Sequence, residues 1–166
     1  VPYPGAPGDE VIRVLQTGHP NGSVWRPGET DVSIRPGWFY HPAEDAKVRT
    51  VDQLVDLYFT SVGRNSQLLL NVPPTREGLL HATDAARLVG MGERLTAIFR
   101  EDLTAGRRTT WRPTGERHAA LEVDLGRTVT VGIADLREDI ERGQVIARYV
   151  LEGSDGGAWK TLARGT

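Results

Sequence analysis

The sequence predicts an α/β segment followed by a segment of short β-strands, and the two meet near residue 105. Two stretches of helical periodicity flank a short continuous apolar run in the first part. Beyond Ala105-Gly106 the apolar residues alternate with polar ones, which is the period of a half-buried strand. We therefore expect helices around a buried parallel strand, and then a β domain.

The first predicted helix occupies about residues 50–62, where apolar side chains recur at helical spacing. Thr50 is placed to cap its first turn, and Gly63 stands where a left-handed residue would end it. The apolar run Leu68–Val72 then predicts a buried strand that stops at Pro73-Pro74.

A second helix is predicted from about Thr83 to Asp102, because apolar residues share one face. Gly90 and Gly92 lie inside this pattern and weaken it. A helix, a buried strand and a helix follow one another as in an α/β fold, in which functional residues cluster beyond the carboxyl ends of the strands.

The second part contains alternating runs that predict strands, and a strong turn signal at Ser154-Asp155-Gly156-Gly157. The predicted strands cover residues 120–125, 129–133, 145–151 and 158–163. A β-sandwich needs around seven strands, so we expect an incomplete one here. The chain also starts without Met and stops soon after a strand, which suggests a piece of a longer protein.

Composition argues against several classes of function. The formal net charge is −2, with 20 basic and 22 acidic residues, which does not favour a nucleic-acid partner. The chain has no cysteine, and its four histidines lie far apart in sequence, so we expect no metal site. No apolar stretch is long enough for a membrane-spanning helix.

The segment from Trp25 to His41 concentrates aromatic, charged and kink-forming residues. This composition fits a sugar-binding surface, in which flat rings face the apolar side of a pyranose and charged groups meet its hydroxyls. The alternative is structural, with Trp38 and Phe39 as core anchors. Glu29 and Asp31 face the same way on an extended segment, as a catalytic pair or as two solvated carboxylates.

Three motifs in this order and spacing resemble the end of the catalytic domain of α-L-fucosidases of glycoside hydrolase family 29. They are Ser33–His41 with Glu44-Asp45, then Ser61–Ser66, then Leu68–Pro74. The resemblance is nearest to the branch acting on α-1,3 and α-1,4 fucosyl linkages. It continues through residues 120–125, 137–140 and 152–163, which are similar to the β-sandwich of those enzymes.

The resemblance implies the last elements of a (β/α)8-like barrel in residues 1–104 and the start of a β-sandwich in residues 105–166. It implies an enzyme that releases terminal α-L-fucose with retention, without metal or cofactor. The aspartate nucleophile of the family lies upstream of Val1, and so does its acid/base in this branch. Glu29 then lines or supports the pocket, and the alternative that Glu29 is itself the acid/base stays open.

By the same resemblance, Trp38 packs against the C5 methyl of fucose, and Trp25, Arg35 and Tyr40 belong to the substrate-binding set. Aromatic walls favour such a methyl group. Arg35 is expected to orient Glu29 or Asp31 in a two-bond pair. We expect structural roles for Arg64, Asn65 and Asn71.

The expected partners are a fucosylated oligosaccharide or glycoconjugate and the remainder of the catalytic barrel, with no nucleic acid and no membrane. Secretion or a periplasmic location is expected, because such enzymes meet glycans outside the cytoplasm. The isolated 166-residue chain is expected to be inactive. The alternative function is a non-catalytic carbohydrate-binding protein.

Overall fold

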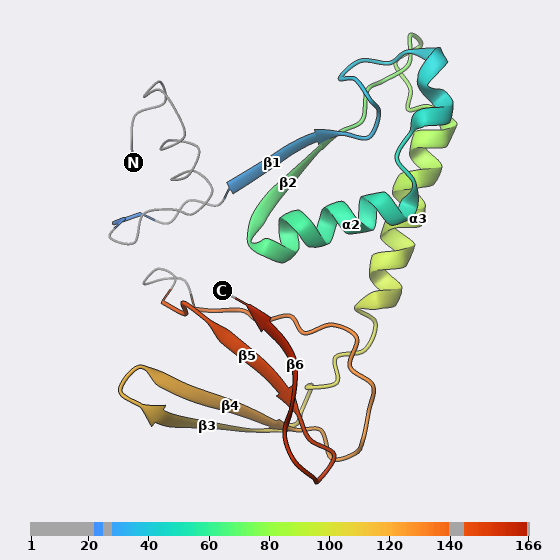
Figure 1. Cartoon of the computed structure of the whole chain (residues 1–166). Helices are drawn as coiled ribbons and strands as arrows, with labels where there is room; N and C mark the ends of the chain where they lie inside the picture. The colour runs from blue at the N-terminus through green and yellow to red at the C-terminus, as the bar shows by residue number, and fades with distance from the viewer. Residues whose placement is uncertain (1–21, 25–27, 140–144, 166) are drawn as a thin grey trace. The chain divides into compact units, whose positions relative to one another are not determined.

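The computed structural model describes residues 22–24, 28–139 and 145–165. The described residues form two compact units that divide between Phe99 and Arg100 (Figure 1). The helices and strands of the first unit are, in chain order, β1 (Gly28–Ser33), η1 (Pro42–Lys47), α2 (Val51–Ser61), η2 (Val62–Arg64), β2 (Ser66–Asn71) and α3 (Ala82–Ile98).

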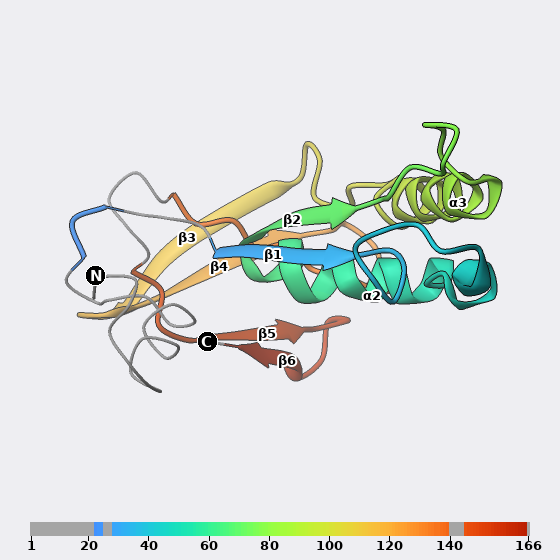
Figure 2. The same ribbon diagram turned by 90° about the horizontal axis from the view of Figure 1, so that it is seen from above.

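Strands β1 and β2 are parallel neighbours, and the chain between them passes through α2. Their register pairs Gly28 with Ser66 at one end and Ser33 with Asn71 at the other. Figure 2 shows the two strands side by side and pointing the same way, with α2 running along them. This β-α-β unit confirms the predicted α/β character, and the described residues of this unit form one two-stranded sheet.

Helix α2 begins as predicted and ends differently. The Thr50 hydroxyl accepts a hydrogen bond from the Gln53 amide at 3.2 Å, and the Gln53 side chain accepts one from the Thr50 amide at 2.9 Å. The predicted left-handed stop at Gly63 is wrong, because the chain continues through η2 and Asn65 takes the left-handed conformation at φ 65°. Asparagine tolerates that region better than most residues.

The core of the first unit consists of Ile34, Val48 and Leu54, which are buried. Partly buried residues of β2 and α3 pack against it. The Arg49 amide also donates to the Ile34 carbonyl at 2.9 Å. The segment between Ile34 and Arg49 contains Trp38, Phe39 and Tyr40, and this hydrogen bond joins its two ends.

Helix α3 is shorter than predicted, since it ends at Ile98 rather than near Asp102. The His81 ring caps it by accepting a hydrogen bond from the Thr83 amide at 3.3 Å. Gly90 faces Val51 of α2, and a Cβ built on Gly90 would lie 2.7 Å from the Val51 Cγ2. The glycine that weakens the helical pattern therefore permits the close approach of α2 and α3.

The second unit contains two antiparallel hairpins. One pairs β3 (Arg108–Gly115) with β4 (His118–Asp124), and the other pairs β5 (Tyr149–Gly153) with β6 (Lys160–Gly165). The turn between β5 and β6 contains the predicted Ser154–Gly157 sequence, with Gly156 at φ 97°. The two hairpins are separate two-stranded sheets, so the expected β-sandwich stays a prediction.

Two details of the predicted strands in this unit are wrong. Residues 129–133 form no strand, and residues 145–148 precede β5 instead of belonging to it. Alternating β-branched residues favour a strand only where a neighbour completes the hydrogen-bond ladder. Sequence analysis also missed β3, in which Pro113 interrupts the pattern and the register shifts between Pro113 and Gly115.

Candidate functional site

The chain bends over residues 34–39, directly beyond the carboxyl end of β1, and this aromatic turn carries Trp38 and Phe39. The Ser33 hydroxyl donates to the Gly37 carbonyl at 2.7 Å, and the Arg35 amide donates to the same Ser33 oxygen at 3.3 Å. Ser33 is buried, the bond from the Arg35 amide is buried, and the bond to the Gly37 carbonyl is partly buried. The backbone therefore reverses direction immediately beyond the sheet, and Trp38 lies within the turn.

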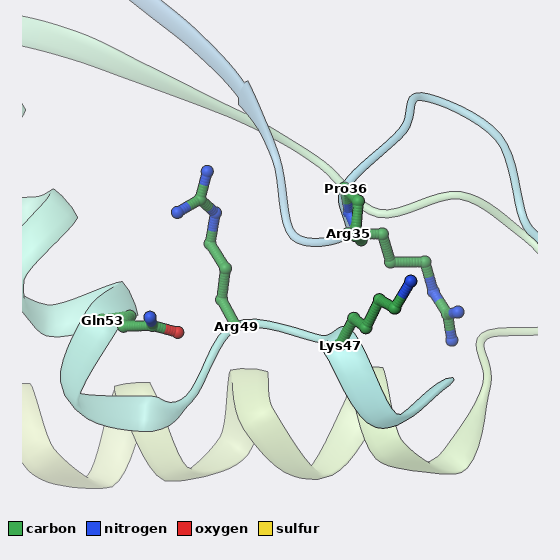
Figure 3. A pocket seen from close by; sticks show the side chains of 5 residues that line it. All are labelled: Arg35, Pro36, Lys47, Arg49 and Gln53. Carbon is green, nitrogen blue, oxygen red and sulfur yellow. The ribbon is translucent and has the colours of Figure 1, made fainter. Parts of the chain in front are cut away.

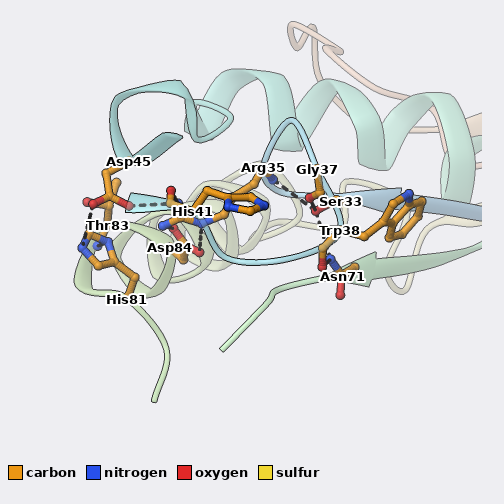
Figure 4. Close-up of polar contacts among 10 residues, drawn as sticks. All are labelled: Ser33, Arg35, Gly37, Trp38, His41, Asp45, Asn71, His81, Thr83 and Asp84. Atoms are coloured by element: carbon orange, nitrogen blue, oxygen red, sulfur yellow. Dashed lines mark hydrogen bonds and ion pairs between the residues drawn. The ribbon is translucent and has the colours of Figure 1, made fainter. Parts of the chain in front are cut away.

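The end of β2 holds this turn from the neighbouring strand. The side-chain amide nitrogen of Asn71 donates to the Ser33 hydroxyl at 3.0 Å and to the Trp38 carbonyl at 3.0 Å (Figure 4). The Asn71 carbonyl accepts from the Ile34 amide at 2.9 Å. Asn71 therefore holds Ile34 through its main-chain carbonyl, and it holds Ser33 and Trp38 through its side-chain amide.

Arg35 is buried and makes two bonds to one carboxylate of α3. Its Nε and Nη2 donate to the two oxygens of Asp84, each at 2.8 Å, and its Nη1 donates to Asp45 at 2.9 Å. The hydrogen bond to Asp84 raises the pKa of Arg35 above its ordinary value, and burial opposes that shift. Arg35 therefore fastens the turn to α3 and to η1.

The predicted pairing of Arg35 with Glu29 or Asp31 is wrong. Both carboxylates lie earlier on β1 and are exposed, whereas Arg35 lies beyond the strand and its side chain reaches α3. Sequence spacing could not show this, because the true partner Asp84 is 49 residues away.

Tyr40 packs on the same guanidinium group. The Arg35 Cζ lies 4.8 Å from the Tyr40 ring centroid, and the ring centroids of Tyr40 and His81 are 5.8 Å apart. The His81 Nε2 lies 3.5 Å from Asp45. Tyr40 thus belongs to a cluster around Arg35, and its predicted contact with substrate stays a prediction.

Trp38 and Phe39 do not belong to the core that the described residues form. The exposed fractions of these residues are 51% and 78%. Contacts within this chain therefore leave both rings accessible, and the structural alternative for them stays open for the complete polypeptide. The Trp38 ring is accessible beside the carboxyl ends of two parallel strands, where α/β folds place their binding sites.

The remaining two predicted site residues are not brought to this turn by any described contact. Glu29 is exposed and lies opposite Gln67 in the strand register. It precedes Ser33 by four residues, which is about 13 Å along a strand. Trp25 lies outside the described residues. The roles of Glu29 and Trp25 stay predictions.

A small hollow lies on the α2 side of the turn. It has a volume of about 220 Å³ and is lined by Arg35, Pro36, Lys47, Arg49 and Gln53 (Figure 3). Trp38 is not among the lining residues, so the hollow is separate from the exposed indole. Arg49 itself donates from Nε to the Ser33 carbonyl at 3.0 Å, which adds another contact to the turn.

No group of three metal-ligating side chains occurs within residues 22–24, 28–139 and 145–165. In the same residues, no helix has the length and apolar character needed to cross a bilayer. Two carboxylates of the site, Asp45 and Asp84, each form an ion pair with the Arg35 guanidinium.

Asp84 was not predicted as part of this site, and Asp45 was named in a motif without a role. Asp84 occupies the first turn of α3, where an acidic residue is ordinary because it favours the helix dipole. Its complete burial is the feature that distinguishes it, and this is a property of the tertiary structure.

Comparisons with known proteins give a consistent result. A family model described as Alpha-L-fucosidase matches residues 8–98, which is more than half of the chain. The chain is 33% identical to "Alpha-L-fucosidase 1" of Arabidopsis thaliana over 96% of its length. A relative from Oryza sativa subsp. japonica has the same identity and the same coverage of the chain.

Solved structures agree with the sequence comparisons. The crystal structure of SpGH29 superposes with a TM-score of 0.82 at 35% identity, covering 93% of this chain and 38% of that one. A Ruminococcus gnavus GH29 fucosidase in complex with fucose superposes with a TM-score of 0.72 at 27% identity, covering 87% of this chain and 34% of that one. The chain spans 36% and 37% of the length of the rice and Arabidopsis relatives.

Proposed function

Because the chain belongs to the α-L-fucosidase family, we propose that it supplies part of a glycoside hydrolase that releases terminal α-L-fucose from glycans. In this proposal residues 1–104 contribute the last elements of a (β/α)8-like barrel, and residues 105–166 begin a β-sandwich. The described β-α-β unit supports the first assignment, and the two hairpins support the second.

The observation that carries the proposal is the accessible Trp38 ring on a turn fixed beyond two parallel strands. An indole at that edge offers a flat apolar wall. Fucose carries a methyl group on C5 that such a wall can cover, and burial of one methyl contributes about 0.8 kcal/mol. Trp38 is therefore assigned to the contact with that methyl group.

The other site residues receive separate roles in the proposal. Arg35 acts indirectly, because its Nε, Nη1 and Nη2 all donate to protein carboxylates. Glu29 is assigned as a carboxylate that lines or supports the pocket, and Tyr40 and Trp25 are assigned to its aromatic surface.

The proposed reaction retains the configuration at the anomeric carbon. A carboxylate attacks that carbon to form a fucosyl-enzyme intermediate, and a second carboxyl group protonates the leaving oxygen and then activates water. We place the nucleophile outside the 166 residues. No metal or cofactor takes part in this scheme.

The proposal also concerns the setting of the reaction. The substrate is a fucosylated oligosaccharide or glycoconjugate, with α-1,3 or α-1,4 linkage, and the rest of the barrel is the required protein partner. We place the enzyme outside the cytoplasm, in the periplasm or secreted, because its glycans occur there.

Hydrolysis of an aryl α-L-fucoside tests the proposal. The complete polypeptide that carries this sequence is expected to release the phenol, and the purified 166-residue chain is expected not to. Turnover by the 166-residue chain would show that the nucleophile lies within it. Fucose binding without turnover by the complete polypeptide would support the alternative of a non-catalytic carbohydrate-binding protein.

A further inference from the structure

We propose that Asn71 is the positioning residue for the fucose methyl contact, because it fixes Trp38 through the Trp38 carbonyl. This inference rests on the proposed function and adds to it a residue that does not itself touch the sugar. Trp38 is 51% exposed in this chain, so packing within the chain does not hold its ring in place. The position of its backbone therefore determines where the indole can lie.

Among the described residues, the Asn71 side-chain amide donates a hydrogen bond to the Trp38 carbonyl. A primary amide carries two hydrogens. The Asn71 nitrogen is within 3.0 Å of both the Ser33 hydroxyl and the Trp38 carbonyl, so both hydrogens have an acceptor. The Ser33 hydroxyl in turn donates to the Gly37 carbonyl. One side chain thus fixes both the start of the turn and Trp38 within it.

Asn71 is itself held rigidly enough to act as a reference point. It is the last residue of β2, it pairs with Ser33 in the parallel register, and its carbonyl accepts from the Ile34 amide. The side-chain amide of Asn71 therefore fixes the aromatic turn relative to the sheet. Arg35 holds the opposite side of the same turn to α3.

The chemistry of the contact requires asparagine. An aspartate of the same shape offers only acceptors when ionised, and would face the Trp38 carbonyl with a like partial charge. Asn71→Asp should therefore release Trp38 while leaving the volume of the side chain unchanged. The expected consequence is a loss of selectivity for the methyl group, and a smaller change in the binding of the ring hydroxyls.

A pair of sugars measures that selectivity directly. D-Arabinopyranose has the ring hydroxyl configuration of L-fucopyranose but carries hydrogen in place of the C5 methyl. The ratio of their dissociation constants for the complete polypeptide, measured by titration calorimetry, is the methyl selectivity. Burial of one methyl group corresponds to a ratio of about fourfold in favour of L-fucose.

The first variant is Trp38→Ala, which tests the proposed function. It is expected to bring the methyl selectivity close to one. If the selectivity is unchanged, the assignment of Trp38 and this inference are both overturned. If the wild-type protein binds neither sugar, the proposed function is overturned as well.

The second variant is Asn71→Asp, which tests the inference alone. Methyl selectivity should fall toward one, and the double variant Asn71→Asp/Trp38→Ala should show no further loss. Unchanged selectivity, or an equal weakening of both sugars, would overturn the positioning role while the assignment of Trp38 stands.

Two further variants separate positioning from loss of stability. Leu88→Ala removes a residue packed against the core of the same unit, and should lower the melting temperature without changing the selectivity. Ser33→Ala removes the shared hydroxyl and should lower the selectivity in the same direction as Asn71→Asp. It provides the decisive measurement if Asn71→Asp does not fold.

Discussion

The guanidinium group of Arg35 and the carboxylate of Asp84 form a buried pair with two hydrogen bonds of 2.8 Å each. The pair joins the turn beyond β1 to the first turn of α3, and both side chains have no solvent exposure. Two-bond pairing of this kind fixes orientation as well as distance. The aromatic turn is therefore fastened to a helix that lies far along the chain.

Asp84→Asn should destabilise the first unit strongly. The substitution leaves the buried Arg35 charge with only the partly exposed Asp45 as an anionic partner, and such a loss costs about 3 kcal/mol of unfolding free energy. Urea unfolding monitored by circular dichroism measures it. Asp45→Asn is the matched control, because it removes one bond from the same guanidinium, and its cost should be about 1 kcal/mol. Equal losses of unfolding free energy in the two variants would contradict the larger contribution of Asp84.

The two glycines of α3 should respond in opposite directions to alanine. Gly92→Ala adds a methyl group where nothing lies within 4 Å, so helix propensity should stabilise the protein by about 0.5–1 kcal/mol. Gly90→Ala places its methyl group 2.7 Å from the Val51 Cγ2, and valine side chains are stiff, so stability should fall. Thermal unfolding compares the variants, and Val51→Ala should rescue Gly90→Ala. Stabilisation by both single substitutions would refute the close packing.

Trp38→Ala should weaken fucose binding far more than it affects folding. The ring is half exposed, so its removal should change the unfolding free energy by less than about 1 kcal/mol. Loss of an aromatic wall should weaken fucose binding by about tenfold. Melting temperature and the inhibition constant of L-fucose in the complete polypeptide measure the two effects. Trp38→Phe should retain most of the affinity, and parallel losses of stability and affinity would return Trp38 to a structural role.

Glu29→Gln should lower kcat/KM of the complete polypeptide by about tenfold through the loss of a charged hydrogen bond. The factor should be the same for an aryl fucoside with a good leaving group and for a fucosylated oligosaccharide, because a residue that lines the pocket does not protonate the leaving oxygen. Asp31→Asn, on the same face of β1, is the control and should have little effect.

The opposite pattern for Glu29→Gln is equally informative. A loss of kcat/KM confined to the substrate with the poor leaving group, together with a lowered kcat for the aryl substrate that azide restores, would identify Glu29 as the acid/base. That result would replace the pocket-lining assignment.

Local chemistry was sufficient to predict several elements. Thr50 and Gln53 lie at the spacing of a capping box, so the start of α2 depends on adjacent residues alone. The Ser154–Gly157 turn is similarly local, because glycine permits the positive φ found at Gly156. Gly63 misled the prediction of the end of α2, since Asn65 could adopt the left-handed conformation two residues later.

The chemistry of the site was predicted only in part. The segment containing Arg35, Trp38 and Tyr40 was identified from its composition, and the exposed indole agrees with a surface role. The partners of Arg35 were predicted wrongly, because the nearest acids in sequence are directed into solvent by the strand. The strand itself, β1, was expected only as an extended segment.

The sequence by itself determined the periodicities, the caps and the turns, since these depend on residues within a few positions of one another. It also determined the family motifs, which need only the order and spacing of residues along the chain. Only the tertiary structure decided that Asp84 neutralises Arg35, that Asn71 holds Trp38, and that Gly90 is needed opposite Val51. Each of these contacts joins residues that are more than 30 positions apart. The Arg35–Asp84 pair depends on burial, and all three contacts depend on approaches of about 3 Å, which folding alone creates.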